Sequence, residues 1–469
     1  MRRLSIAFLL LIAIVLQSPV RAHVGSPDVF LESMAGPYRL LVTVRPPKTI
    51  PGIADVDVLV TSDDVREVRI VPLPLAGAGA KFAPVPDRAS RSAEDPRLFT
   101  GHLWLMSAGA WQIRVAVSGE SGDGTLSVPV PTLPQTTLAM SRALGVMIFI
   151  FAFLLGAGFV AIASAMAREA KLGAGEALDP RARRRGRIAG VVATVFVCGV
   201  AFLMNMWWTV EATAYDRYVY KPLAATTTLG DGALRLELND PGWISSRRID
   251  DFIADHGHLM HLFVVSPDLN HLWHLHPDQS RPGRFEMRSP SLPAGAYEVF
   301  ADVVHATGVS ETVVGRIDAP ATAGAPLSGD DSAWAADDPS AATNIEWVRD
   351  TAPLVPRKLT MFTFRVLDEK GEPARDLELY MGMPGHAIFV RRDRKVFAHV
   401  HPSGSAPMVL LDAMSGMNAH AQHAAGTPSV VTFPYGFPEA GDYRIFVQVK
   451  RAGTIVTGAF DATVKESAK

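Results

Sequence analysis

The feature that most constrains this fold is an internal repeat built around histidines. Residues 256–277 read HGHLMHLFVVSPDLNHLWHLHP, and residues 385–402, GHAIFVRRDRKVFAHVHP, repeat that pattern in register. In both copies a histidine is followed at the same distance by a His-x-His-Pro sequence. The likeness continues in LPAGAYEVFADV at 292–303 and FPEAGDYRIFVQV at 437–449. The chain therefore carries a tandem duplication, and we expect two domains of the same kind.

The first copy predicts a β-hairpin with three histidines on one face. Its runs HLFVV and HLWHLH are rich in apolar and aromatic residues, and the SPDL segment between them contains the turn formers Pro and Asp. With Pro267 and Asp268 at the centre of the turn, His261 lies directly opposite His274. His276 points to the same side because side chains two residues apart on a strand share a face.

The second copy predicts the same arrangement. A turn centred on Arg392 and Asp393 groups His386, His399 and His401, although a slip of one residue would scatter the set. Because imidazole binds copper, zinc, nickel and iron alike, both sets are candidate metal sites. The alternative is that these histidines pack on a half-buried sheet or cap strand ends beside the prolines.

A third group of candidate ligands lies in the segment MSGMNAHAQH. Met414, Met417, His420 and His423 recur at every third residue, and thioethers are soft ligands that select Cu(I). This group favours copper over zinc. The alternative is that the methionines only fill gaps in a core.

The N-terminus predicts export and a fourth candidate site. Residues 1–22 have the basic, apolar and small-residue regions of a signal peptide, and cleavage after residue 22 would leave His23 first. A terminal amine with its own imidazole chelates Cu(II), and His102 in the same domain could complete the site. The alternatives are an uncleaved anchor and a histidine left at the cleavage point by chance.

Two apolar runs, 144–166 and 188–209, are long enough to span a bilayer as helices. The loop between them, 167–187, is rich in arginine, so the positive-inside rule places it in the cytoplasm. The large regions on either side then lie outside. We expect a bacterial inner-membrane protein with both its N-terminal and C-terminal domains in the periplasm.

The remaining chain predicts three all-β domains, immunoglobulin-like or cupredoxin-like sandwiches, at 23–137, 225–318 and 346–466. Short alternating runs divided by Gly, Pro and Asp indicate such folds. Residues 319–345 form a linker by composition, and its acidic pairs are expected to be solvated rather than to bind calcium. The single cysteine, Cys198, lies in the second apolar run, which excludes an internal disulfide and a blue-copper site.

Other features point away from catalysis and nucleic acid. No nucleophile elbow, HExxH, phosphate loop or paired-carboxylate motif occurs, so we expect no enzymatic activity. A net charge of −2 gives no basis for nucleic-acid binding. His256 and His258 lie in a polar turn and are expected to be solvent-exposed, with a lesser chance of joining a site.

Part of the sequence resembles known families. HVGSP, GPYRLLVTVRPP and FTGHLWLMSAGAWQIRVAV in the N-terminal domain are similar to YtkA-like and FixH-like exported domains, which share an immunoglobulin-like sandwich with CopC-like periplasmic copper proteins. The resemblance implies Cu(II) binding through His23 and His102, without a matching acidic ligand. The two histidine segments also resemble repeats in bacterial membrane proteins associated with heavy-metal genes.

These observations favour a membrane-anchored periplasmic protein that binds a metal, copper first and zinc second, for copper tolerance or delivery. One alternative is an interaction scaffold whose domains dock an envelope or respiratory complex and whose histidines are structural. Another is an assembly factor for a respiratory oxidase, like FixH-type proteins.

Overall fold

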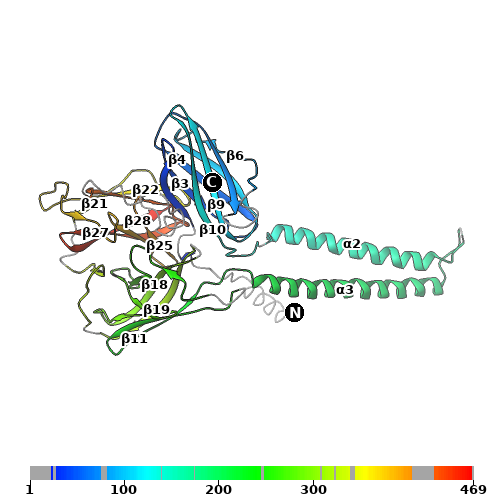
Figure 1. The fold of residues 1–469 in the computed structure, drawn as a ribbon. Coiled ribbons are helices and arrows are strands. Elements are labelled where there is room, and N and C mark those ends of the chain that lie inside the picture. The colour runs from blue at the N-terminus through cyan, green and yellow to red at the C-terminus, as the bar shows by residue number, and fades with distance from the viewer. Residues whose placement is uncertain are drawn as a thin grey trace. The chain divides into compact units, whose positions relative to one another are not determined.

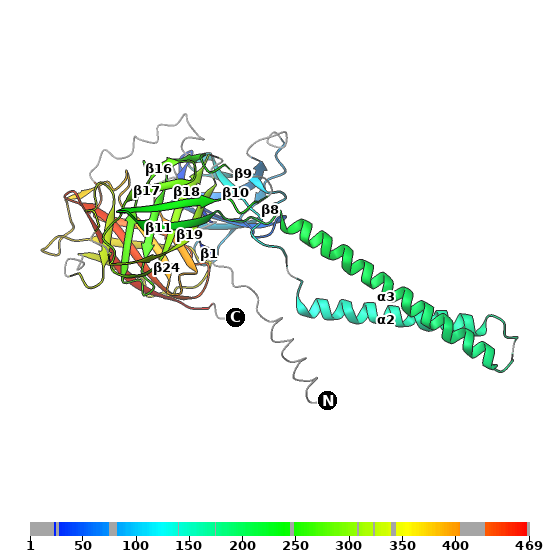
Figure 2. The same ribbon diagram turned by 90° about the horizontal axis from the view of Figure 1, so that it is seen from below.

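The computed structural model describes residues 23–24, 28–74, 82–138, 140–173, 175–243, 248–306, 309–321, 324–338, 344–403 and 427–466 (Figures 1 and 2). These residues fall into two compact units. One contains the residues up to Thr132 and from Lys221 onwards, and the other is Leu133–Tyr220. The β-strands belong to the first unit and the two long helices to the second.

The N-terminal part of the first unit has two antiparallel sheets around one core. Its strands are β2 (Val29–Ala35), β3 (Tyr38–Arg45), β4 (Gly52–Val60), β5 (Val65–Pro74), β6 (Asp87–Arg88), β7 (Ser90–Arg91), β8 (Leu98–Leu105), β9 (Gly109–Gly119) and β10 (Gly122–Thr132). The sheet orders are β2-β3-β4-β8-β7 and β10-β9-β5-β6. Alternate residues such as Val56 and Val58 on β4 and Ile113 and Val115 on β9 are buried in the same core. The period-two pattern of the sequence therefore becomes the inner face of each sheet.

The first histidine copy lies in a second pair of sheets, the first repeat domain. Its strands are β11 (Ala224–Gly230), β12 (Ala233–Asn239), β13 (Phe252–Ile253), β14 (His261–Val265), β15 (His271–Leu275), β16 (Asp278–Arg281), β17 (Arg284–Arg288), β18 (Gly295–His305), β19 (Ser310–Ala319) and β20 (Ser332–Ala335). The small sheet has the order β11-β12-β17-β16. The large sheet has the order β13-β18-β14-β15-β20, with β19 also paired to β18. Leu236 and Phe285 of the small sheet and Leu262 and Val264 of the large one share a core.

The second copy lies in a third pair of sheets, the second repeat domain. Its strands are β21 (Ile345–Val348), β22 (Thr360–Val366), β23 (Leu377–Glu378), β24 (His386–Arg391), β25 (Val396–Val400), β26 (Val430–Tyr435), β27 (Gly441–Arg451) and β28 (Thr454–Val464). The small sheet is β21-β22-β26, and the large sheet joins β25, β24, β27 and β23, with β28 also paired to β27. The first described strand of the chain, β1 (His23–Val24), pairs in parallel with β25 at the edge of this large sheet.

The large sheets of the two repeat domains pack against each other. Phe263, Phe300, Phe397 and Phe446 form a separate apolar cluster with other residues of both sheets, and all four are fully buried. Each central strand therefore buries both of its faces, one in its own domain and one in this interface. That explains why runs such as HLFVV are continuously apolar instead of alternating.

Both hairpins turn at the predicted residues, but the pairing of their strands differs from the prediction. Leu262 pairs with Leu275, which sets His261 opposite His276 instead of His274. The turn closes from Ser266 to Leu269, whose backbone amide donates to the Ser266 carbonyl at 2.9 Å. The predicted pairing was therefore wrong by two residues along the partner strand. Because two residues is one full period of a strand, the three histidines still share a face.

The second hairpin shows the same displacement. Ala387 pairs with Val400, so that His386 stands opposite the position of His401 rather than opposite His399. Its turn contains Arg394 with a positive φ of 61°, matching Leu269 at 59° in the first copy. The duplication thus extends to the backbone conformation of the turn.

The segment predicted as a linker contains strand β20. Ser332 pairs with His274 and Trp334 with Leu272, which adds a strand to the edge of the large sheet. Trp334 also meets Phe446 of the second repeat domain edge to face, with ring centroids 5.3 Å apart. The segment's composition of small and acidic residues did not indicate a strand.

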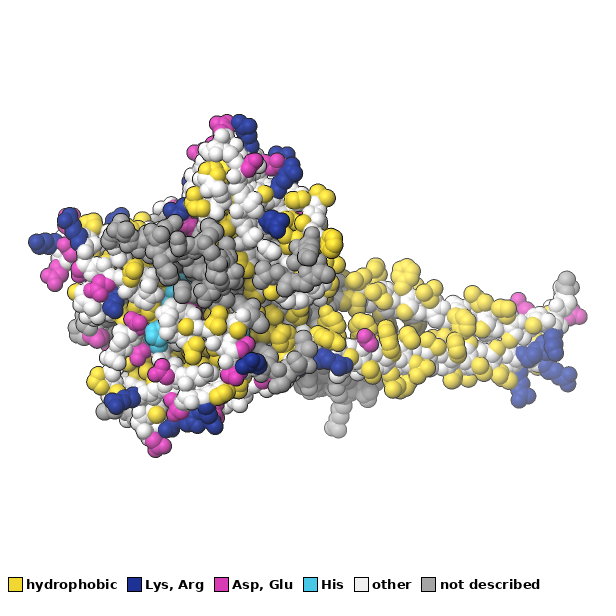
Figure 3. Space-filling model, viewed as in Figure 1, with side chains coloured by type: hydrophobic (Ala, Val, Ile, Leu, Met, Phe, Trp, Pro, Cys, Tyr) yellow, Lys and Arg dark blue, Asp and Glu magenta, His cyan; other side chains and the backbone are white. Residues whose placement is uncertain are grey.

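The second unit consists of α2 (Arg142–Glu169) and α3 (Pro180–Asp216), capped at their N-termini by Ser141 and Asp179. Both are long and apolar enough to cross a membrane. Hydrophobic side chains cover their surface, and basic side chains gather near the connection between them (Figure 3). The helices extend beyond the apolar runs 144–166 and 188–209, because part of the arginine-rich loop is already the start of α3.

Candidate metal centre

Among the residues that the structure describes, eight histidines gather in one cluster between the two repeat domains. Their rings form a continuous network of neighbours with centroids 4.0–6.4 Å apart. The members are His256, His258, His261, His274, His276, His386, His399 and His401. The two predicted sets are therefore adjacent halves of a single cluster, which we call the histidine cluster.

Strand periodicity places this cluster. On β14, His261 shares the interface face with Phe263, and on β24, His386 shares it with Ile388. The aromatic and aliphatic side chains on these faces fill one part of the interface, and the histidines fill the neighbouring part. A stack of Phe263 on His274, with centroids 4.3 Å apart, joins the two parts.

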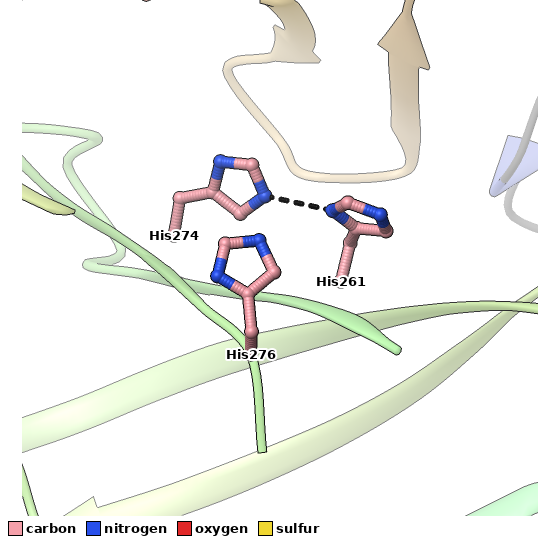
Figure 4. A group of neighbouring side chains, drawn as sticks. All are labelled: His261, His274 and His276. Carbon is pink, nitrogen blue, oxygen red and sulfur yellow. Dashed lines mark hydrogen bonds between the residues drawn. The ribbon is translucent and has the colours of Figure 1, made fainter. Parts of the chain in front are cut away.

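The first set has the geometry of a ligand group (Figure 4). One ring nitrogen each of His261, His274 and His276 lies within 4.8 Å of the others. Nδ1 of His261 is only 3.2 Å from Nε2 of His274. Donor atoms bound to one tetrahedral Zn(II) at 2.0–2.1 Å would be about 3.3 Å apart.

The outer nitrogens of this set determine which atoms carry protons. Nε2 of His261 lies 3.1 Å from the carbonyl oxygen of Asp255, which only accepts. Nδ1 of His274 lies 2.8 Å from Oε1 of Gln448, which also only accepts. Each neutral ring therefore keeps its proton on the outer nitrogen, and both inner nitrogens present lone pairs to each other. Two lone pairs at this separation repel unless a proton or a metal ion lies between them.

His276 is oriented in the same way by a carboxylate. Its Nδ1 lies 3.0 Å from Oδ1 of Asp331, an oxygen that also accepts from the His276 backbone amide at 2.9 Å. Its Nε2 is buried and has no hydrogen-bond partner among the residues that the structure describes. A histidine held by a carboxylate on one nitrogen and open on the other is the usual arrangement around a protein-bound metal.

The second set is less completely oriented. His399 has Nδ1 3.4 Å from a carboxylate oxygen of Asp302, across the domain interface. Within the described part of the chain, His399 Nε2 has no hydrogen-bond partner, and neither does either ring nitrogen of the fully buried His386. Since an unsatisfied buried polar group costs about 1–3 kcal/mol, a ligand that occupies these nitrogens would stabilise the fold.

A third ligand group was not predicted. Asp255 and His256, from the turn before β14, lie with His401 within 4.8 Å by their donor atoms. His256 and His258 were expected to be solvent-exposed. That expectation was wrong, because both are partly buried and His258 stacks on His276 with centroids 4.0 Å apart.

Burial disfavours the charged form of five histidines in the cluster. It is the main cause of pKa values well below the ordinary histidine value at His261, His274, His386 and His399. Burial also lowers the pKa of His401 to about 4. Neutral imidazole is the form that binds metal, so protons compete weakly for these nitrogens near neutral pH.

The other predicted site residues lie apart from this cluster or outside the described structure. Met414, Met417, His420 and His423 are outside the described residues. His23 pairs through its backbone with Val396 on β25. His102 lies on β8 in the N-terminal part, exposed, with Nδ1 2.9 Å from a carboxylate oxygen of Asp55. The resemblance to CopC-like proteins gave no acidic residue to match the acidic ligand of their copper site, and Asp55 is an acidic neighbour of His102.

The structure adds supporting residues that the sequence did not reveal. Tyr380 donates to the Asp330 carbonyl at 2.8 Å and lies 3.3 Å from Nδ1 of His274. Asp330 and Asp331 belong to the segment expected to be a solvated linker, yet Asp331 holds His276. Nothing in the local sequence distinguishes such residues, because their role depends on contacts between distant strands.

Comparisons with known proteins point to the same region. A family described as a domain of unknown function (DUF8832) matches residues 221–319 and 341–466, slightly less than half of the chain. These ranges coincide with the two repeat domains, so the similarity covers the histidine cluster and not the helices. No curated protein sequence matches this chain.

Solved structures are similar only at low scores. The tetra-tandem repeat of a large adhesion protein matches with 9% identity over 90% of this chain and 72% of that one, at a TM-score of 0.16. Invasin, a bacterial integrin-binding protein, has 10% identity over 94% and 60%, at 0.15. The BSP domain of a biofilm-associated protein has 7% identity over 97% and 68%, at 0.16.

Proposed function

We propose that this chain binds a transition-metal ion in the histidine cluster, with copper as the first candidate and zinc as the second. The supporting observation is the 3.2 Å contact between Nδ1 of His261 and Nε2 of His274. Acceptors on the far side of both rings leave two lone pairs facing each other. A cation removes that repulsion and uses both nitrogens as ligands.

The rest of the proposal, on membrane topology, domain type and further copper ligands, follows the expectations from the sequence. The two helices anchor the chain in a bacterial inner membrane, with the arginine-rich connection in the cytoplasm and the β-domains in the periplasm. The three pairs of sheets are immunoglobulin-like or cupredoxin-like domains. In that compartment the cluster would serve copper tolerance or delivery, with Met414, Met417, His420 and His423 as a Cu(I) acquisition segment and His23 with His102 as a separate Cu(II) site.

The test is a metal titration of the full chain in detergent, purified without a histidine tag. Cu(I) is added anaerobically against a chelator, and Cu(II) and Zn(II) aerobically. The double variants H274Q/H276Q and H399Q/H401Q each remove two ligands. We expect a loss of copper affinity of about 100-fold or more, since the loss of even a hydrogen-bond partner of a ligand costs about 10–100-fold.

The matched control is H271Q, because His271 lies on the same hairpin but is partly exposed and outside the cluster, with Nε2 3.9 Å from Asp337. If both double variants keep wild-type metal affinity and only melt at lower temperature, the histidines are structural. The interaction-scaffold and oxidase-assembly alternatives would then replace metal binding.

A further inference from the structure

A tight turn directs one histidine of the first repeat domain into the second. Asp255 and His258 exchange backbone hydrogen bonds of 2.8 and 3.1 Å, and the central residues His256 and Gly257 both have positive φ, 51° and 91°. A histidine in the left-handed region is uncommon, and such conformations persist where the surroundings fix them. The turn brings the His256 ring to 4.7 Å from the ring of His401.

The donor atoms of this group are close and without hydrogen bonds. Nε2 of His256 lies 3.4 Å from Oδ1 of Asp255, and Nε2 of His401 lies 3.9 Å from Oδ2 of the same carboxylate. Asp255 Oδ1, His256 Nε2 and His401 Nε2 are all buried and have no hydrogen-bond partner among the described residues. Buried polar atoms are normally satisfied, so three together indicate a missing partner.

The charge of the group indicates what that partner is. Among the described residues, the ion-pair neighbours of Asp255 are His256 and His401, and no lysine or arginine is paired with it. Two imidazole nitrogens and a carboxylate oxygen, all within 4.8 Å of one another, match the ligands of a divalent cation.

We infer that Asp255, His256 and His401 form a second metal site of mixed oxygen and nitrogen ligands, which takes a divalent ion such as Zn(II) or Cu(II) and joins the two repeat domains. This inference rests on the proposed metal-binding function of the same cluster but concerns a different ligand set and ion. Carboxylate is a harder ligand than imidazole or thioether, so the site disfavours Cu(I). His401 also belongs to the second predicted set, so the mixed site lies beside that set.

Within the described residues, the duplication gives one such site and not two. In the second copy the equivalent turn, Tyr380–Met383, has the same reciprocal backbone bonds of 2.8 and 3.1 Å and positive φ at Met381 and Gly382. Tyr380 stands there in place of Asp255 and Met381 in place of His256, so the turn offers neither the carboxylate nor the imidazole ligand. We therefore expect one equivalent of divalent ion at this position rather than two.

The experiment compares Zn(II) and Cu(I) uptake by the full chain in detergent for four proteins: wild type, D255N, H274Q and H271Q. D255N keeps the shape of the side chain but not its charge. We expect it to lose one equivalent of Zn(II), or at least tenfold in affinity, and to bind Cu(I) like wild type. H274Q should lose Cu(I) but keep the equivalent that depends on Asp255, and H271Q should change neither.

The outcomes separate the two proposals. If D255N and a second variant, H256Q, retain full Zn(II) stoichiometry and affinity while H274Q loses copper, the mixed site is refuted and the imidazole site stands. If H274Q has no effect but D255N removes one Zn(II), the mixed site stands without the first. Circular dichroism melting of each variant verifies that it is folded, so that a loss of metal cannot come from a loss of structure.

Discussion

Oε1 of Gln448 lies 2.8 Å from Nδ1 of His274, although the two residues belong to different repeat domains. The amide nitrogen of Gln448 donates to Ser332 Oγ at 2.9 Å and to Thr457 Oγ1 at 3.2 Å, which fixes the direction of the amide. The equivalent residue in the first copy, Asp302, faces His399 of the second in the same manner. Each domain therefore orients a histidine of the other.

Replacement of Gln448 should weaken metal binding without removing a ligand. Q448M deletes the acceptor that keeps the proton of His274 on Nδ1, so the ring is free to take the wrong tautomer. We expect copper affinity to fall by about 10–100-fold, the usual effect of losing such a partner. T457V is the control, because it removes a hydrogen bond from the far side of the same amide. An equal loss of affinity in both variants would contradict the role of the acceptor.

The apolar part of the interface should carry much of the contact between the repeat domains. Phe300 and Phe397 stack with centroids 4.2 Å apart and planes 9° apart, both fully buried. Either change to Ala should cost about 3–5 kcal/mol. F82A is the control, since Phe82 is 78% exposed, and its effect should stay within about 0.5 kcal/mol.

The pairing of the two rings is measurable separately from their burial. In urea unfolding of the two single variants and F300A/F397A, a double-mutant cycle should give a coupling energy of about 0.5–1.5 kcal/mol. Strictly additive effects would mean that the rings do not support each other across the interface.

The local pattern of the sequence was sufficient to predict the two sets of three histidines. It was not sufficient to predict that the two sets lie side by side. The identical spacing of His261, His274 and His276 and of their copies places each set on one face under either hairpin register. The uninterrupted apolar run at 262–265 is also typical of a strand buried on both sides. What covers the second face depends on contacts between strands more than a hundred residues apart, and no local pattern encodes it.

One further signal was present in the duplication. Aligning the copies through His261 and His386 sets HGH at 256–258 against MGM at 381–383. Both triplets place two residues of metal-ligand type around a shared glycine, which indicates a turn with the same role in both copies. This favours a place for His256 and His258 in the histidine cluster rather than in solvent. The carboxylates could not be found in this way, since Asp255 corresponds to Tyr380 and Asp331 lies in a segment of linker-like composition.

The rim of the interface contains an arginine on β27 whose loss should weaken the contact between the repeat domains. Nη1 of Arg444 donates to the Leu269 carbonyl at 3.0 Å and to Oδ1 of Asn270 at 2.8 Å, both in the first repeat domain. Hydrogen bonds from a charged donor contribute about 1.5–3 kcal/mol, so R444M should lower the free energy of unfolding by that amount.

The matched control is R365M, because Arg365 is exposed and its nearest acidic oxygen, on Glu346, is 3.9 Å away. Exposed pairs of this kind contribute about 0–1 kcal/mol. Equal destabilisation by the two variants in urea unfolding would show that the contact of Arg444 with the first repeat domain adds nothing.

A buried ionic group away from the cluster should make stability depend on pH. Nδ1 of His305 lies 3.0 Å from Asp251 and Nε2 lies 3.1 Å from Glu311, and Glu311 also accepts from the Leu223 amide. Burial alone would lower the pKa of His305, but the hydrogen bonds and charges of the two carboxylates outweigh it and raise the pKa above its ordinary value. The folded state therefore holds this proton more tightly than the unfolded state, whose pKa is about 6.5.

The sign of the effect follows from that difference. The stabilisation is complete below about pH 6.5 and is lost as the pH rises through the folded-state pKa. The comparison protein is the double variant H305Q/E311Q. It keeps polar side chains of similar size but removes the imidazole of His305 and the carboxylate of Glu311. We expect the difference in melting temperature between the full-length wild type and this variant to shrink between pH 6.5 and 9. A difference that stays constant over that range would mean that His305 is not charged in the folded protein.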